Sequence, residues 1–211
     1  MAEKIKAPKV YQFRPLKTLT GVTLFFLALK ILSTGGLVAC QVYKGLTVGR
    51  LDVDDLHDPV VAVYDLLCLG YLTVAVISGI VTLFWMAGAT RNTLAIRPEL
   101  KMSQLGAVGW WFVPFASLYK PYQYVRDIWA TAQGLSGRGA SAAERPLAIW
   151  WFSFLGGNVI SYIVSKAAPD SWIGTSIGFA LILISSVLFF AIVRTVGRNQ
   201  KAQSTAVAEV F

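Results

Sequence analysis

The stretch GWWFVPFASLYKPYQYVRDIW, residues 109–129, decides the fold that we expect for this chain. It begins inside an apolar run, is broken by Pro114 and ends as a charged, amphipathic pattern. The apolar run, residues 105–119, has 15 residues, which as a helix span about 22 Å, whereas a bilayer core is about 30 Å thick. We therefore predict a re-entrant segment, which enters a membrane and returns to the same side.

Composition places the rest of the chain in a membrane as well. Hydrophobic residues make up 55% and charged residues 14% of its 211 positions, whereas soluble domains carry about 25% charged residues. Four further apolar runs are long enough to cross a bilayer; they are residues 21–43, 60–87, 147–165 and 173–193. We predict an all-α integral membrane protein with one transmembrane bundle over 21–198, an interfacial N-terminal segment over 1–20 and a C-terminal tail over 199–211.

The distribution of lysine and arginine orients these predicted helices. With residues 105–119 re-entrant, both termini lie on one side together with 15 basic residues, and only Lys44, Arg50 and Lys166 lie on the other. If the segment crossed the membrane, nine would lie on each side. Because basic residues concentrate in cytoplasmic loops, four spans with cytoplasmic termini are favoured. The net charge of +8 then indicates topology and attraction to anionic lipid, and not nucleic-acid binding.

The residue types in the re-entrant segment suit a membrane boundary. Trp110 and Trp111 can bury their rings there while their N–H groups stay hydrated. Pro114 breaks regular helix, and irregular backbone at membrane depth has to be covered by other protein. We therefore expect the other spans to pack over the break. The alternative is a short, tilted helix that merely packs against the bundle.

A second helix is expected to follow the break. Pro121 is well placed in its first turn, where a missing N–H costs no hydrogen bond. We predict an amphipathic helix over residues 121–133, lying along the membrane interface. Its apolar face comprises Tyr122, Val125, Ile128, Trp129 and Ala132.

The stretch from Trp110 to Trp129 also carries a family resemblance. Its pattern, W-W-F-V-P-F-x-x-L-x-x-P-Y-x-x-x-x-x-x-W, resembles an uncharacterised bacterial membrane family, domain of unknown function 4328. The similarity covers roughly residues 60–195 and includes matches outside the stretch at Trp85, Arg91, Asn92, Leu94, Trp150 and Trp151. The chain departs from the pattern at 103–106, where the family often has proline, and at Ser117, where it often has asparagine. The resemblance implies a multi-pass protein of the bacterial inner membrane and supplies no biochemical activity.

Lys30 is the most unusual residue within the predicted spans. A charge at membrane depth is costly and is by default a functional hypothesis. Thr34 lies one turn further along the same helix face, which we expect to point into the protein. Asp65 has the opposite charge but lies about 12 Å away in depth, whereas Asn158 lies at a better depth but is neutral. Lys30 is then an ion or proton site or a subunit contact; alternatively, it makes a structural polar contact or reaches up to the interface.

Small residues indicate close packing between the last two predicted spans. They recur one helical turn apart, as small-xxx-small pairs do in membrane helices, at Ser153, Gly157, Ser161, Gly174 and Gly178. We expect contact within the chain, although such stripes also join subunits. The two cysteines, Cys40 and Cys68, could form a disulfide near the outer ends of their spans. The simpler alternative is a pair of small buried residues.

No motif in the sequence supports catalysis. His57 is the only histidine, and the acidic residues around it at 51–58 lack the spacing and glycine of a calcium loop. Zinc-protease, phosphate-loop and CxxC motifs do not occur either. We therefore predict no catalytic residue, no metal site and no cofactor.

Three functions remain as hypotheses. We favour a non-enzymatic accessory or scaffold subunit of a larger membrane complex, or a lipid-interacting module. Its partners would be membrane lipids and other membrane protein subunits. The alternative is a small transporter or channel component that uses Lys30 and the re-entrant segment. A membrane enzyme acting on lipids is the third hypothesis.

Overall fold

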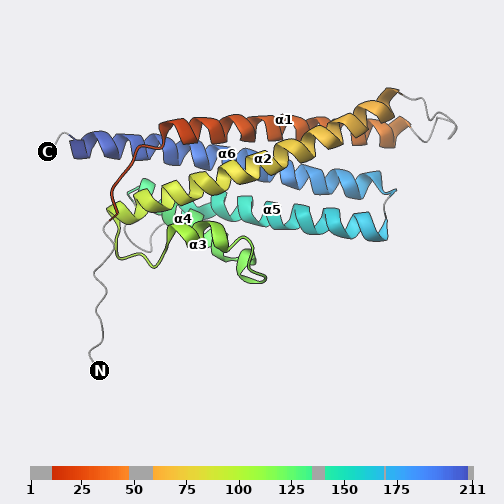
Figure 1. Ribbon diagram of the computed structural model, residues 1–211. Helices are drawn as coiled ribbons and strands as arrows, with labels where there is room; N and C mark the ends of the chain where they lie inside the picture. Colours follow the sequence, from red (N-terminus) through yellow and green to blue (C-terminus); the bar gives the residue numbers. More distant parts are fainter. Residues whose placement is uncertain (1–10, 48–58, 135–140, 169, 209–211) are drawn as a thin grey trace.

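The chain is all-helical in the computed structural model, which describes residues 11–47, 59–134, 141–168 and 170–208 (Figure 1). No strand occurs in these ranges. In chain order the elements are α1 (Lys17–Thr47), α2 (Pro59–Ile96), α3 (Gln104–Gly109), the 3-10 turn η1 (Ala116–Leu118), α4 (Lys120–Ala132), α5 (Ser141–Ala167) and α6 (Trp172–Ala208). His57 and the acidic loop lie outside the described residues.

Four of these helices are long and apolar enough to cross a membrane. The candidate spans are Lys17–Thr47, Leu66–Ile96, Glu144–Ala167 and Trp172–Gln200. This confirms the prediction of an all-α chain with four helices suited to span a bilayer. The helices run beyond the apolar runs because extending an existing helix adds one hydrogen bond per residue, whereas starting a new helix is costly.

The long helices pack as a row. Helix α1 lies between α2 and α6, and α6 lies between α1 and α5. Helix α4 contacts α2, α5 and α6, and so bridges the two ends of the row. Figure 1 shows α3 and α4 near the end of the bundle where the C-terminus lies, with the segment between them standing outside the four long helices.

Small residues allow α5 and α6 to approach closely. Gly157 lies against Gly178, whose carbonyl oxygen would be 3.1 Å from a Cβ added to Gly157. Gly178 in turn packs against Ser161, and Gly174 also packs against α5. Ser153, which belongs to α5, is buried. The small-residue stripes therefore meet within the chain. By contrast, the two cysteines do not meet, since Cys40 and Cys68 are free, half-buried thiols.

Aromatic side chains fill the core where α2, α5 and α6 approach one another. The rings of Trp150 and Phe189 stack with centroids 5.0 Å apart, and Trp85 meets Phe189 edge-on at 6.1 Å. The indole N–H of Trp85, which is fully buried, donates to Thr20 Oγ1 at 3.2 Å. This bond satisfies a donor that would otherwise be stranded in the core and fastens α1 to α2.

Asn92 fastens the segment that precedes α1. Its Oδ1 accepts from the backbone N–H of Arg14 at 3.0 Å, and its Nδ2 donates to the Arg14 carbonyl at 2.8 Å and to Gln200 Oε1 at 3.3 Å. Residues 11–16 are not helical, so this fully buried amide supplies the hydrogen bonds that a helix would have made. One side chain thereby joins α2, α6 and the N-terminal segment.

Candidate ligand site

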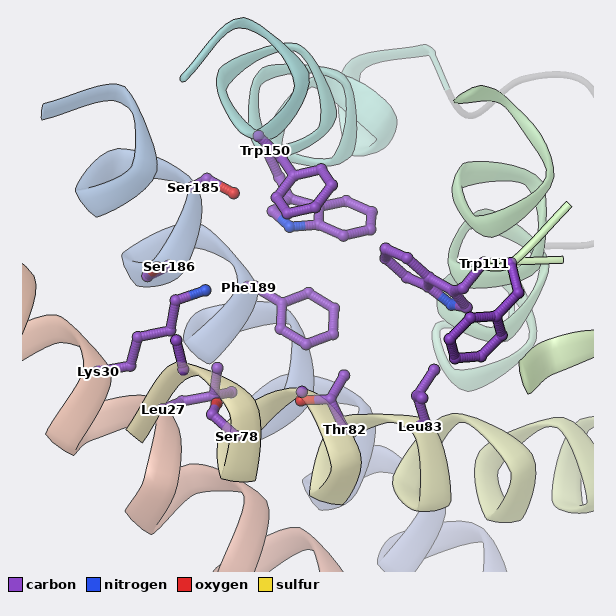
Figure 2. A pocket seen from close by; sticks show the side chains of 14 residues that line it. Leu27, Lys30, Ser78, Thr82, Leu83, Trp111, Trp150, Ser185, Ser186 and Phe189 are labelled. Atoms are coloured by element: carbon purple, nitrogen blue, oxygen red, sulfur yellow. The ribbon is translucent and has the colours of Figure 1, made fainter. Parts of the chain in front are cut away.

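A cavity of about 360 Å³ lies among α1, α2, α5, α6 and the segment between α3 and η1 (Figure 2). We call it the Lys30 cavity, after the only charged side chain among the described residues that line it. Most of its wall is apolar and aromatic, including Leu27, Leu83, Phe112, Trp150, Phe154 and Phe189. A volume above about 300 Å³ and a mostly apolar wall are typical of small-molecule sites.

Lys30 supplies a charge to this cavity from the middle of α1. Its side chain is half-buried, and Figure 2 shows it reaching into the space it shares with Phe189 and the serines of α6. Its backbone carbonyl accepts from the hydroxyl of Thr34 at 2.6 Å, and Thr34 is fully buried. This face of α1 points into the protein, as the spacing predicts. The ammonium group has no ion pair or hydrogen bond with any described residue.

Trp111 supplies a second donor that has no acceptor. Its Nε1 is buried and unpaired, while its ring meets the rings of Trp151 and Phe154 edge-on, each at 5.9 Å. Leaving a buried donor unpaired costs about 1–3 kcal/mol. The ring of Trp111 thus forms part of the wall of the Lys30 cavity, while its N–H is enclosed by the protein and unpaired.

Hydroxyl groups complete the polar part of the wall. They come in pairs on two helices, one turn apart on α2 and adjacent on α6: Ser78, Thr82, Ser185 and Ser186. The hydroxyl of Ser186 donates to the Ile182 carbonyl at 2.8 Å, which ties it to its own helix. No carboxylate belongs to the described lining. The polar groups of the described lining that can face a ligand are therefore a cation and hydroxyls.

Of the two partners suggested for Lys30, the structure describes the side chain of Asn158 alone, and Asn158 does not line the Lys30 cavity. Asn158 is exposed, and its Nδ2 donates to the Phe154 carbonyl at 2.7 Å. The expectation from depth was wrong here, because depth gives a position along a helix and not a direction. An amide can also be satisfied by its own helix, as it is here. Asp65 belongs to α2, and its side chain lies outside the described residues.

The segment between α3 and α4 is anchored at its two ends and exposed at its tip. Ser103 caps α3 by accepting from the Gly106 N–H at 2.9 Å. After the tip, the indole of Trp151 donates to the Leu118 carbonyl at 2.9 Å. Between these anchors Phe112 and Phe115 are 72% and 83% exposed. The two anchors hold the segment against the bundle while its apolar tip projects outward.

The expectation that other spans cover Pro114 was wrong, because Pro114 is itself exposed. Local turns satisfy much of the broken backbone instead. The backbone N–H of Ala116 donates to the Pro114 carbonyl at 2.7 Å, and the backbone N–H of Ser117 donates to the Val113 carbonyl at 2.9 Å. Phe115 takes a φ of 61°, a conformation that non-glycine residues rarely adopt. The tip is therefore a tightly turned loop that bonds to itself.

Helix α4 starts beside this loop and packs against α2, α5 and α6. Pro121 lies in its first turn, and the ammonium of Lys120 sits 5.8 Å from the ring centroid of Trp110. Trp129 is 9% exposed and lies in the core with the rest of the predicted apolar face, except that Tyr122 is only partly buried. Sequence analysis missed Tyr124, which is buried and whose hydroxyl accepts from the Ser103 N–H at 3.2 Å. The helical spacing 124, 125, 128, 129 and 132 could have indicated it.

The fold and the cavity together define a class. In its described residues the chain is all-helical, with four candidate membrane spans and a mostly apolar cavity between them that carries one cation. It belongs to the family described as Domain of unknown function (DUF4328), whose sequence model matches residues 52–208. Comparison with the curated proteins and with the solved structures returned no match. The matched region contains every described residue of the cavity wall except Leu27 and Lys30, which α1 supplies.

Proposed function

We propose that this protein is a non-enzymatic, multi-pass module of the bacterial inner membrane that binds an amphiphilic lipid in the Lys30 cavity. The observation that carries the proposal is an unpaired ammonium, that of Lys30, in a mostly apolar cavity whose wall includes the ring of Trp111. An unpaired ammonium in apolar surroundings calls for an acceptor from outside the protein.

The chemistry of the cavity selects a monoanion with an apolar body. One ammonium balances one negative charge, so that no net charge is left in a medium of low dielectric constant. A carboxylate can accept from the Lys30 ammonium, and charge-assisted bonds of this kind are the stronger ones. The aromatic wall of Trp150, Phe154 and Phe189 suits an acyl chain. A fatty acid has both parts.

The same proposal includes a topology. The positive-inside count favours cytoplasmic termini, with residues 105–119 entering from the cytoplasmic face. Support comes from the exposed apolar tip around Phe112 and Phe115, since a bilayer would cover side chains that water would not. Trp110, with Lys120 over its ring, suits the headgroup level.

Binding of a fatty acid brominated on its acyl chain tests the proposal, because bromine quenches nearby indole fluorescence. The purified protein should be quenched saturably. Lys30→Met should weaken binding by about tenfold or more, since a hydrogen bond to a charged group contributes ~1.5–3 kcal/mol. Lys166→Met is the matched control, because Lys166 is exposed and lies outside the cavity. Lys30→Arg should restore part of the affinity.

Two results would overturn the assignment. One is Lys30→Met protein that keeps its melting temperature and binds the acid as tightly as the parent chain. The other is a long-chain alcohol that binds as well as the acid of equal length, because the alcohol carries no charge for Lys30 to pair.

A second candidate is a small transporter or channel component. It is favoured by the hydroxyls of Ser78, Thr82 and Ser185, which line the cavity together with Lys30. Reconstitution into liposomes separates the two functions. Proton or solute flux that Lys30→Met abolishes would support transport, whereas binding without flux supports the lipid-binding module. Copurification of other subunits in mild detergent would extend the module to an accessory role.

A further inference from the structure

A second pocket, of about 420 Å³, lies nearer the start of α1. It is formed by the segment before α1, the first turns of α1 and the end of α6, and it shares no lining residue with the Lys30 cavity. We call it the interfacial pocket. Its walls combine basic side chains with apolar ones, among them Leu16 and Leu24.

Three cations line the interfacial pocket without any acidic residue. They are Lys17 at the start of α1, and Arg194 and Arg198 on α6. The two arginines are four residues apart and so project from the same side of the helix. All three are exposed, and none forms an ion pair in the described part of the chain. Elsewhere Arg97 pairs with Glu99 at 2.8 Å and thereby holds the pKa of that carboxyl below its usual value.

Two neutral oxygens of the pocket already accept hydrogen bonds from the protein. Thr20 Oγ1 accepts from the Trp85 indole, and Gln200 Oε1 accepts from Asn92. A ligand in this pocket therefore meets three cations that form no ion pair in the described part of the chain, and charge complementarity requires the ligand to be an anion. Two arginines side by side can donate several hydrogen bonds to one phosphate, in a geometry that lysines alone do not offer.

The position of the pocket indicates which kind of anion. Lys17 begins the first candidate span, and Gly197 packs against Thr20, so the basic groups of α1 and α6 lie at one level near the ends of their apolar runs. Leu24 continues the pocket wall along α1 into the apolar part of the helix. A phosphate at this level with acyl chains beside α1 describes a phospholipid. Basic pockets between membrane helices on the cytoplasmic side bind anionic headgroups.

We propose that the interfacial pocket, built from Lys17, Arg194 and Arg198, holds the headgroup of an anionic phospholipid of the cytoplasmic leaflet. This site is independent of the Lys30 cavity and takes a different ligand. Its occupant would also rest against the segment that Asn92 fastens, so that lipid binding and docking of the N-terminal segment support each other.

Native mass spectrometry of the protein released from nanodiscs tests the site. The discs contain equal amounts of phosphatidylglycerol and phosphatidylcholine, and retained lipid is counted for each variant. The parent chain should retain phosphatidylglycerol preferentially. The double variant Arg194→Gln/Arg198→Gln should lose affinity for it by about 30-fold, which corresponds to ~2 kcal/mol, since the charge-assisted hydrogen bonds from both guanidinium groups to the headgroup phosphate are lost. Arg194→Lys/Arg198→Lys should keep an intermediate affinity because it retains the charge but not the planar guanidinium.

The matched control is Lys101→Gln/Arg145→Gln, which removes the same charge at exposed positions outside the pocket. It should leave the preference within about twofold of the parent chain, because exposed charges that are not part of a site contribute little. If the control loses phosphatidylglycerol as strongly as the arginine variant, the preference is a general surface effect and the site is overturned.

Competition with inorganic phosphate separates a lipid headgroup from a free anion. Retention of phosphatidylglycerol should persist in millimolar phosphate, whereas displacement by phosphate alone would overturn the lipid assignment. Lys30→Met should leave phosphatidylglycerol retention unchanged, and the arginine variant should still bind brominated fatty acid. Failure of one site is thereby distinguishable from failure of the other.

Discussion

At the residue scale, two side chains stand out because they hold unused hydrogen-bonding capacity in an apolar setting. Lys30 and Trp111 come from elements 81 positions apart in the sequence, yet they line one cavity. The sequence singled out each of them separately, Lys30 by its charge and Trp111 by its place in the paired tryptophans. Their meeting could not be predicted, since it depends on how α1 and the tip segment pack against the remaining helices.

Asn92 shows the opposite use of a polar side chain, with every group engaged. Asn92→Ala should lower the free energy of unfolding by about 2–4 kcal/mol, because three bonds of ~0.5–1.5 kcal/mol each are lost. Proteolysis should also reach residues 11–16 sooner. Asn199→Ala is the control; its bond to Gln133 is exposed to solvent, so its effect should stay below about 0.5 kcal/mol. Equal effects in thermal melting would contradict the role given to Asn92.

At the element scale, the sequence predicted where helices lie along the chain better than it predicted which way their side chains face. The apolar runs and the break at Pro114 were readable because length and proline act locally. The exposure of the tip around Phe115 could not be predicted, because local turns, and not packing by other spans, satisfy its backbone hydrogen bonds. Asn158 was misplaced for a similar reason, because its amide binds its own helix. Tyr124 was missed although its spacing was readable.

The contact between α5 and α6 gives an element-scale prediction. Gly178→Leu should destabilise the protein by about 1–3 kcal/mol, since the added side chain meets Ser161 at close range and forces the helices apart. Gly70→Leu is the matched control, because nothing lies within 4 Å of a Cβ added there. Its effect should be neutral or slightly stabilising, by up to about 1 kcal/mol. Unfolding in detergent measures both, and a stable Gly178→Leu protein would refute close packing at this site.

At the scale of the whole molecule, composition and run length were sufficient to predict four membrane-suited helices. They were not sufficient to predict their order in the bundle. The row α2–α1–α6–α5 follows from which faces fit together, and fit depends on pairs such as Gly157 with Gly178 and Trp150 with Phe189. The cavity results from this arrangement of helices, so no local sequence pattern predicts it.

The topology is testable at this scale by labelling single cysteines in intact cells, in a chain carrying Cys40→Ser and Cys68→Ser. Ser103→Cys and Gln133→Cys should react only with reagents that reach the cytoplasm, and Asp170→Cys should react from outside. These sites flank the tip segment and the α5–α6 connection. If Gln133→Cys reacts from outside and Asp170→Cys from the cytoplasm, residues 105–119 cross the membrane and the re-entrant arrangement is wrong.

The most direct test of lipid binding in the Lys30 cavity is an experimental structure of the protein with a brominated fatty acid. The carboxylate should lie within hydrogen-bond distance of Lys30 Nζ, with the brominated chain along Trp150, Phe154 and Phe189. A ligand found only on the outer surface, or a saturated protein whose cavity holds none of it, would contradict the proposed function.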